Sequence, residues 1–546
     1  MKRLPLVTVL ALLAVTVAIS VGLAAGSPGA SPSPSSGRVA QQPTGSPAPP
    51  SEPSAPPSSA PPTVPATATP PQLAAVPIVP VTQFRTTAER TTSKEVAAVL
   101  AGTSKTYDAL ELVDADADPI LAALGAERPA AGDPHLVLAA DEQTLATDLA
   151  RNRQHLAFLR AAQVGPSVRA LGWGDASLFG EGHVKQTADW PLMAQLPVDA
   201  GSAASQPFDA SKLWTLAAGG DILLDRGVAQ TVKVKKKGVD FPFDGGSAEI
   251  TGHTCCSGLG WEVPQAKRTG DAGAMRDLLQ NADLAIANFE NPAPDSFRYH
   301  TSGTVFSADP KLIKGLANAG LDWVSLANNH IGDAGRNGIL QTIANLADYG
   351  IKSGGAGKDA KTARRPTILD ADGTKVGIIA YDTIAPGYRA GTTKPGSASF
   401  TVENVKSDVK KARDAGAQVV IVFPHWGTEY DPTPFAGQQN LAHAAIDAGA
   451  DLVIGNHAHW AGAVEVYDGK PIWYALGNFV FDQSWSEPTM EGMTLELTFD
   501  GPTLVQARMR PHIILDKSQP NFLDPAGDGR VVLGQVFDAS KGLLPW

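Results

Sequence analysis

Short apolar runs and amphipathic stretches alternate along the chain from residue 213 to residue 510. Apolar runs bounded by Gly, Asn or Asp predict buried strands over 213–218, 284–287, 323–327, 375–381, 418–423, 451–454 and 471–476. Apolar stripes at helical spacing predict helices over 272–281, 311–319, 336–349, 402–415 and 438–448. Two further strands, 491–499 and 503–510, predict a closing hairpin. This alternation is typical of an α/β fold, in which helices pack on a mostly parallel sheet.

A weaker pattern of the same kind precedes this region and predicts a small α/β domain over 73–205. Val76–Val81 is an extended run whose two prolines allow an edge strand at most. Helices are expected over 93–100 and 141–151, with a strand over 135–138 between them. No motif in this domain points to a ligand, so its role stays open. The main domain is expected over 206–546.

The N-terminus has the pattern of an export signal. Lys2 and Arg3 precede an almost wholly apolar run, Leu4–Gly26, so residues 1–26 are expected to be either a cleaved signal peptide or a signal-anchor. Residues 27–72 are rich in Pro, Ser and Ala and predict a disordered linker. An extracytoplasmic location follows, with the chain either secreted or held at the cell membrane by its N-terminal segment.

Charge and cysteine content argue against two functional classes, nucleic-acid binding and a cysteine-based zinc site. The chain has 44 basic and 55 acidic residues, a net charge of −11, which argues against nucleic acid as a partner. Its two cysteines, Cys255 and Cys256, are adjacent, which favours a vicinal ring or an inert pair over a zinc site. They fall in an insertion, 227–269, that we expect to be a loop-rich cap near the functional site.

Metal-ligating residue types follow the apolar part of separate predicted strands. Each residue taken alone has an ordinary structural explanation, such as a turn or a helix cap. Ligands in open α/β sheets bind beyond the carboxyl ends of the strands, so these residues together predict one site. The residues are Asp221, Glu290, Asn329, His330, His425, His457 and His459.

A set of carboxylate, imidazole and amide ligands suits two divalent ions, with Mn, Fe or Zn favoured over Ca. Glu290 is the candidate that bridges both ions, and Asp221 binds the first. Two ions can activate water and bind phosphate oxygens. His330 directly follows a ligand and is the candidate proton donor to a leaving oxygen, with Asp333 orienting it. Arg226 either contacts an anionic substrate or pairs with a surface carboxylate.

The motifs around these residues resemble those of the CapA-type capsule (poly-γ-glutamate) synthesis family, within the calcineurin-like metallophosphatase superfamily. The resemblance covers about residues 213–500. The motifs are Gly220-Asp221, Asn288-Phe289-Glu290, Ala327-Asn328-Asn329-His330-Ile331-Gly332-Asp333, His425-Trp426-Gly427-Thr428-Glu429-Tyr430, Gly455-Asn456-His457-Ala458-His459 and Leu476-Gly477-Asn478-Phe479.

The resemblance implies a four-layer αββα sandwich with a two-metal site at one edge. By position, Asp221, Glu290 and His459 resemble first-metal ligands, and His330 matches the catalytic histidine. The residues that resemble second-metal ligands are Glu290, Asn329, His425 and His457. Asn478, in the last motif, is a further candidate for substrate contact.

Two positions depart from the pattern of the superfamily. The superfamily usually has Asp-x-His at the first motif, where this chain has Leu223, so the first metal lacks one nitrogen ligand. The second motif usually supplies Asp, where this chain has Glu290. These departures leave open whether the first metal is weakly held, differently ligated or absent.

The leading hypothesis is an exported dimetal hydrolase that cleaves a phosphoester or related bond in synthesis of poly-γ-glutamate or a related envelope polymer. Its substrate would be an anionic envelope polymer or a phosphoester. One alternative is a non-catalytic subunit of a membrane complex for polymer synthesis or export. Another is a γ-glutamyl amide hydrolase or transferase that uses the same activated water on a carbonyl.

Overall fold

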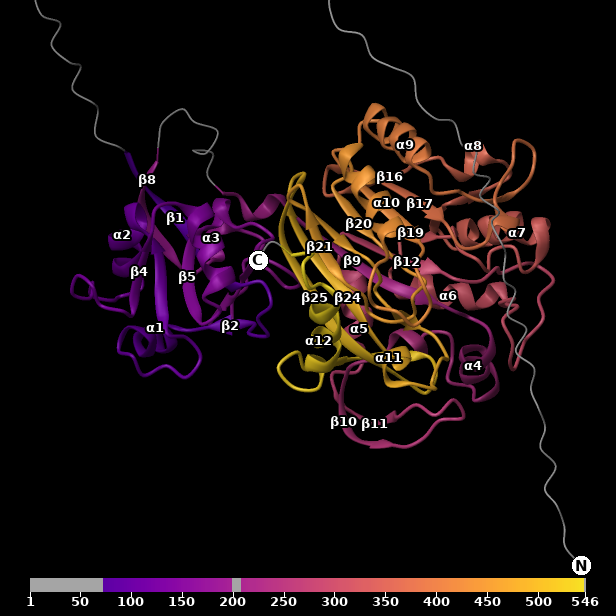
Figure 1. Cartoon of the computed structure of the whole chain (residues 1–546), viewed down its shortest axis with the longest axis horizontal. Coiled ribbons are helices and arrows are strands. Elements are labelled where there is room, and N and C mark those ends of the chain that lie inside the picture. Colours follow the sequence, from indigo (N-terminus) through magenta and orange to yellow (C-terminus); the bar gives the residue numbers. More distant parts are fainter. Residues whose placement is uncertain (1–71, 199–207, 545–546) are drawn as a thin grey trace, which may run out of the picture. The chain divides into compact units, whose positions relative to one another are not determined.

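The computed structural model describes residues 72–198 and 208–544 (Figure 1). The signal segment predicted over 1–26, and all but the last residue of the linker predicted over 27–72, lie outside the described residues. Within the described residues, no helix is both long and apolar enough to cross a membrane.

Residues 72–198, which apart from Gln72 lie within the segment predicted as a small α/β domain, contain a sheet of their own with helices packed on it. Its sheet has the order β4-β3-β5-β1-β6, and β8 pairs with the first half of β1. The helices are α1 (Ser93–Leu100), α2 (Ala117–Ala123) and α3 (Glu142–Arg151). The strands are β1 (Gln72–Gln83), β3 (Ala109–Val113), β4 (Leu136–Ala139), β5 (His155–Arg160), β6 (Val168–Ala170) and β8 (Met193–Val198).

Strand β1 is not the edge strand that its prolines predict. It pairs with β8, β5 and β6 along different parts of its length. Pro77 is aligned only with Met193 of β8, and Pro80 only with Phe158 of β5. Each proline therefore lies where the strand has a register partner on one side, and its missing N–H removes no ladder bond on the other.

The main domain contains two sheets. In the first, four parallel strands, β9-β12-β13-β14, continue into a largely antiparallel arm, β24-β25-β26-β10-β11. The short β23 (Asn478–Val480) pairs with the end of β9. The strands of the first sheet are β9 (Leu213–Ile222), β10 (Ser247–Thr254), β11 (Val263–Gly270), β12 (Leu284–Phe289), β13 (Trp323–Ser325), β14 (Lys352–Gly354), β24 (Glu491–Asp500), β25 (Thr503–Leu515) and β26 (Gln519–Leu523).

The second sheet has the order β16-β17-β19-β20-β22-β21, and its four middle strands are parallel. The strands are β16 (Thr367–Ala371), β17 (Thr374–Asp382), β19 (Val419–His425), β20 (Leu452–Ile454), β21 (Val464–Tyr467) and β22 (Lys470–Trp473). The strands β17, β19, β20 and β22 correspond to predicted strands, whereas β16 and β21 were not predicted.

The two sheets face each other across one apolar core. Leu216 and Ile286 of the first sheet share this core with Ile378 and Ile421 of the second, and all four side chains are fully buried. Helices α5 (Ala274–Asn281), α6 (Ile313–Asn318) and α7 (Gly335–Asp348) cover the outer face of the first sheet. Helices α9 (Val402–Asp414) and α10 (Ala436–Asp447) cover the second (Figure 1). The expected four-layer αββα sandwich is confirmed.

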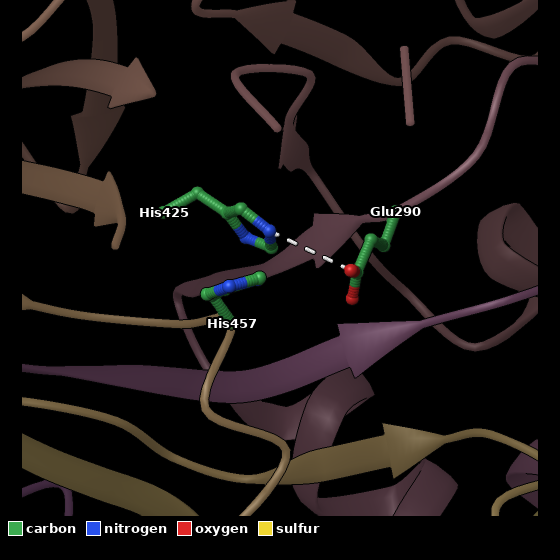
Figure 2. Close-up of side chains that lie close together, drawn as sticks. All are labelled: Glu290, His425 and His457. Atoms are coloured by element: carbon green, nitrogen blue, oxygen red, sulfur yellow. Dashed lines mark ion pairs between the residues drawn. The ribbon is translucent and has the colours of Figure 1, made fainter. Parts of the chain in front are cut away.

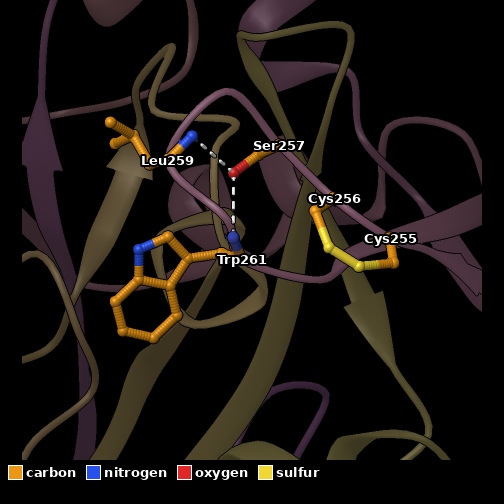
Figure 3. The surroundings of a disulfide bond; sticks show 5 residues. All are labelled: Cys255, Cys256, Ser257, Leu259 and Trp261. Atoms are coloured by element: carbon orange, nitrogen blue, oxygen red, sulfur yellow. Dashed lines mark hydrogen bonds between the residues drawn. A yellow bond between two sulfur atoms is a disulfide. The ribbon is translucent and has the colours of Figure 1, made fainter.

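The insertion over 227–269 is more regular than expected. After α4 (Arg226–Ala229), it forms the hairpin β10–β11, so the expectation of a loop-rich segment is wrong there. Both strands are largely exposed, so neither shows the apolar alternation that reveals a half-buried strand. Cys255 and Cys256 form a disulfide near the hairpin tip (Figure 3). Trp261 on the same tip meets Trp460 edge-on, with ring centroids 5.8 Å apart.

Candidate metal centre

Carboxylates from the first sheet meet histidines from the second at the carboxyl ends of parallel strands. Asp221 is the second-last residue of β9, and Glu290 directly follows β12. His425 ends β19, while His457 and His459 follow β20. All five residues are at most 3% exposed. The structure thus brings together residues that are scattered over more than two hundred positions, with His457 N–H donating to Asp221 Oδ2, 236 residues away, at 3.1 Å.

Two groups in this cluster have spacings that suit a metal ion, and Glu290 belongs to both. One is Glu290 with His425 and His457, and the other is Asp221 with Glu290 and His459; within each, the ligand atoms lie within 4.8 Å of one another. Glu290 Oε1 lies 3.5 Å from His425 Nε2 and 3.9 Å from His459 Nε2, and Figure 2 draws the first of these ion pairs. Glu290 therefore occupies the position that a bridging ligand needs.

Unsatisfied polar atoms in the cluster fit a bound cation. Both carboxylate oxygens of Glu290, and Nδ1 of His457, are buried without a hydrogen-bond partner among the described residues. Burial, the Asp221 charge and the Glu429 charge raise the pKa of Glu290 well above its usual value. Burial beside other histidines lowers the pKa of His425 well below its usual value and that of His457 to about 3. Neutral imidazoles beside a carboxylate without a partner are the donor set that divalent transition metals bind.

Amide side chains behind the cluster orient its members. Asn288 Nδ2 lies 2.7 Å from Asp221 Oδ1 and 3.1 Å from His425 Nδ1. Asn478 Oδ1 lies 2.8 Å from His459 Nδ1, which leaves Nε2 of that ring to face Glu290. Asn288 was not predicted as a site residue, although it directly precedes the Phe289-Glu290 pair.

Asn478, predicted to contact substrate, is fully buried. Its Nδ2 donates to Gln483 Oε1 at 3.0 Å and to the Thr489 carbonyl at 2.9 Å. With its Oδ1 bonded to His459, each polar atom of this amide has a partner within the protein. The predicted substrate contact stays a prediction, and the observed contacts give Asn478 a positioning role.

Asn329 connects the cluster to the predicted catalytic histidine. Its Oδ1 lies 2.8 Å from His425 Nε2, and its Nδ2 lies 3.1 Å from His330 Nε2. His330 Nε2 is also 3.9 Å from Glu290 Oε1. The side chains predicted as ligands and the predicted proton donor therefore share one small volume.

His330 is held in place from behind by Asp333. Its Nδ1 lies 2.9 Å from Asp333 Oδ2, which also accepts the Phe306 N–H at 2.9 Å. The other oxygen of Asp333 accepts the Tyr388 hydroxyl at 3.1 Å. This arrangement directs Nε2 toward the cluster, as a general acid at this position requires. Tyr388 ends a short 3-10 helix, Pro386–Tyr388, 55 residues downstream of Asp333, and no local motif marks it.

Arg226 and Leu223 lie beside the cluster. Arg226 is 8% exposed, forms an ion pair with Asp482 and lies over the Phe306 ring at 4.8 Å from its centroid. Of the two roles weighed for Arg226, the ion pair is present, although it is buried rather than at the surface. Leu223 is fully buried in a small apolar group with Phe306 and Phe481, so its position offers no ligand atom.

His457 and His459 have an uncommon backbone conformation, with φ values of 95° and 56°. Non-glycine residues rarely adopt positive φ, and such residues gather at functional sites. The loop after β20 places both rings on the cluster through these two left-handed residues. In an extended strand alternate side chains share a face, but that geometry is not what brings these two rings together.

The part of the chain that carries the candidate metal centre is similar in sequence to known proteins. Residues 215–483 match the family model of the bacterial capsule synthesis protein PGA_cap. The capsule biosynthesis protein CapA of Bacillus anthracis is 35% identical over 274 residues, 49% of this chain and 66% of that protein. The PGA biosynthesis protein CapA of Bacillus subtilis is 32% identical over 216 residues, 39% of this chain and 57% of that protein. The chain therefore spans between just over half and just under two thirds of these relatives.

Two further comparisons involve a mycobacterial protein and a solved structure. A probable polyglutamine synthesis accessory protein of Mycobacterium tuberculosis is 32% identical over 37% of this chain and 54% of that protein. The solved calcineurin-like phosphoesterase YfkN of Bacillus subtilis aligns over 60% of this chain and 96% of that chain, with a TM-score of 0.31 and 16% identity. Through residues 215–483, this chain belongs to the bacterial capsule synthesis protein family that includes the CapA proteins.

Proposed function

We propose that this chain is a metal-dependent hydrolase that cleaves a phosphoester or related bond during synthesis of poly-γ-glutamate or a related envelope polymer. The observation that carries the proposal is Glu290, a fully buried carboxylate that belongs to two ligand groups and whose two oxygens have no hydrogen-bond partner among the described residues. Family membership supports a role in synthesis of this polymer, since two of the related proteins are named for capsule and PGA biosynthesis.

The ligand groups fit two divalent ions, one held by Asp221, Glu290 and His459 and the other by Glu290, His425 and His457. Such ions supply Lewis acidity toward a phosphoryl group and lower the pKa of water. Asn329, which lies between His425 and His330, adds an amide oxygen at the second position.

The protein's own chemical step is proton transfer. His330, oriented by Asp333 through Nδ1, donates a proton from Nε2 to the oxygen that leaves. Asp333 holds the ring in one orientation, while Tyr388 and the Phe306 N–H hold that carboxylate in place. His330 Nε2 thus faces the cluster, where charge on the leaving group develops.

The N-terminal sequence supports a function outside the cytoplasm. Lys2, Arg3 and the apolar run over 4–26 favour export, and the Pro-rich linker favours a domain held away from a membrane. The proposed partners are an anionic envelope polymer or phosphoester substrate and the membrane complex that makes it.

The test is hydrolysis of bis(p-nitrophenyl) phosphate by the full chain, with and without added Mn²⁺ or Zn²⁺. We expect metal-dependent turnover, and we expect His330→Ala to lower kcat about a hundredfold or more, the usual contribution of a positioned proton donor. His443→Ala is the control, since His443 lies on the outer helix α10 and pairs with Glu465.

Turnover that is equal in the His330→Ala and His443→Ala proteins would remove His330 from the mechanism. No turnover and no bound metal in the unaltered chain would favour a non-catalytic subunit of a synthesis complex instead.

A further inference from the structure

Partly exposed aromatic side chains gather in one place beside the candidate metal centre. Of the nine tryptophans in the described part of the chain, five are at most 2% exposed. Three of the other four form one aromatic cluster with a tyrosine, and none of the four members is fully buried. The members of this aromatic cluster are Trp261, Trp460, Trp485 and Tyr430. A group of exposed indoles is unusual on a protein surface and marks a region that another molecule covers.

The rings of the aromatic cluster form a continuous series that ends at a candidate metal ligand. Neighbouring rings within the cluster have centroids 5.8 Å to 6.3 Å apart. Tyr430 in turn stacks on His459, with ring centroids 6.1 Å apart and an angle of 29° between the planes. Burial and the charges of Glu429 and Glu290 raise the pKa of Tyr430 to about 12. The aromatic cluster therefore adjoins the candidate metal centre directly.

Trp261 is the outer end of the aromatic cluster. It lies on the tip of the β10–β11 hairpin and is 45% exposed, while Leu259 on the same tip is 67% exposed (Figure 3). The ring of Trp261 meets that of Trp460 edge-on, and Trp460 directly follows the candidate ligand His459. The hairpin tip therefore adds exposed apolar surface to the aromatic cluster on the side that faces solvent.

Polar contacts hold the hairpin tip in position. Ser257 Oγ accepts the Trp261 N–H at 3.2 Å, as Figure 3 shows, and the Ser257 N–H donates to the Trp261 carbonyl at 2.8 Å. His253 Nε2 of strand β10 lies 3.0 Å from the Glu487 carboxylate of the short helix α11 (Glu487–Met490). The indole is thus set in place before a ligand arrives. A site formed in advance loses less entropy on binding than one that must be ordered by its ligand.

Carboxylates beside the aromatic cluster indicate the chemistry of its occupant. Glu262 directly follows Trp261, Glu429 directly precedes Tyr430, and both glutamates are exposed. Such carboxylates repel a unit rich in carboxylate or phosphate, and they accept hydrogen bonds from hydroxyl groups. A saccharide ring has matching features, because its slightly positive C–H groups pack on the negative face of an aromatic ring and its hydroxyls donate hydrogen bonds.

We propose that the aromatic cluster binds a sugar ring of the substrate, next to the phosphoester that is cleaved at the candidate metal centre. The proposal rests on the hydrolase function proposed above and names its substrate class, a phosphoester joined to a saccharide unit. Trp261, which the insertion contributes, is then a residue that determines specificity. It selects the substrate by the sugar, while the ligand groups act on the phosphoryl group.

Equilibrium binding to the full chain tests the aromatic cluster apart from catalysis. The neutral probes are chitotriose and maltotriose, and the charged probes are a γ-linked glutamate pentamer and choline, each titrated by calorimetry with a chelator present. We expect Trp261→Ala to weaken binding of at least one trisaccharide about threefold to tenfold, the loss of one aromatic contact, and Trp261→Phe to restore most of it. The control is Leu340→Ala, which removes a 38% exposed side chain from the outer helix α7.

The proposal is overturned if neither trisaccharide binds, or if both bind equally well to the Trp261→Ala and Leu340→Ala proteins. It is also overturned if Trp261→Ala weakens binding of the pentamer or of choline alone, which would assign a polyanion or a cation to the aromatic cluster. Saccharide binding that depends on Trp261 in a chain without hydrolase activity would keep the saccharide site and reject the hydrolase. Hydrolysis of bis(p-nitrophenyl) phosphate without saccharide binding would do the reverse.

Discussion

Burial acts in opposite directions on the acids and bases of the candidate metal centre. It raises the pKa of Glu290 and lowers the pKa of His425 and His457, so each group is driven toward its neutral form. For the histidines this is the ligating form. For Glu290 the neutral form does not suit metal binding, and a bound divalent cation would favour its charged form. The residues are thus matched to a metal by their environment as well as by their type.

Asn478 offers a test of ligand positioning. Asn478→Ala removes the partner of His459 Nδ1, so the ring loses its fixed orientation, and metal affinity should fall about tenfold to a hundredfold. Asn345→Ala, on the outer helix α7, is the control and should bind metal like the unaltered chain. Competitive chelator titration of both variants measures the effect. An affinity for metal in Asn478→Ala equal to that of the control would contradict a positioning role.

Burial of His512 predicts that the protein loses stability at acidic pH, independently of the metal ligands. It is fully buried, lies 2.9 Å from the Asn478 carbonyl, and burial lowers its pKa to about 4. From about pH 6.5 down to about pH 4 the unfolded chain binds a proton here that the folded chain does not. The free energy of unfolding should therefore be fully retained above about pH 6.5 and fall by about 3 kcal/mol as the pH drops to about 4.

Urea unfolding between about pH 7 and about pH 4.5, with a chelator present, measures this dependence. His512→Gln should show a shallower decline, whereas His443→Gln should follow the unaltered chain. Identical pH slopes in all three proteins would exclude His512 as a source of the acid sensitivity.

At the scale of elements, the end of strand β9 depends on a close backbone approach. A Cβ on Gly220 would lie 1.9 Å from the Gly477 carbonyl oxygen, just before Asp221. Only glycine leaves room for this approach, which brings the residues before β23 against β9. In the Gly-Asp motif, Asp221 therefore supplies the candidate ligand, and Gly220 leaves the room that lets the neighbouring backbone position it.

Gly220→Ala should destabilise the protein by about 2 kcal/mol or more, because backbone on both sides has to move. It should also weaken metal binding, since Asp221 moves with the strand. Gly252→Ala is the matched control in β10, where the nearest atom to the added Cβ is Gln265 Oε1 at 3.9 Å. Denaturant unfolding compares the two variants, and equal stability would rule out the steric argument.

Sequence periodicity predicted the buried elements best. The strands β9, β12 and β19, which place Asp221, Glu290 and His425 at their carboxyl ends, are central and fully buried, and their bounds agree with the predicted ones within a few residues. The β10–β11 hairpin was missed because its exposed strands lack an apolar face. Tyr388 was missed because its role comes from a tertiary contact with Asp333 that no local spacing encodes.

At the scale of the whole molecule, the two sheets are joined by more than their shared core. Asp221 and Glu290 belong to the first sheet, while His425, His457 and His459 belong to the second. An ion bound by both sets links the halves of the sandwich. Binding to the folded state alone stabilises that state by mass action.

Metal removal should therefore lower the melting temperature of the full chain by a few degrees, and added Mn²⁺ or Zn²⁺ should restore it. His457→Ala should lose most of this shift, while His443→Ala keeps it. Differential scanning calorimetry with and without a chelator measures the change. If the melting temperature of the unaltered chain does not change with metal, a link between the sheets through the metal is contradicted.

The long separation between the two ligand sets has a consequence for the timing of assembly. A chain that is synthesised from its N-terminus contains Asp221 well before His457, which follows 236 residues later. No complete site exists until nearly the whole sandwich has been made and its second sheet has paired. Raw affinity separates the transition metals poorly, so supply matters. The ion in the finished protein is then chosen by the compartment in which the last strands close, and export would move that choice outside the cytoplasm.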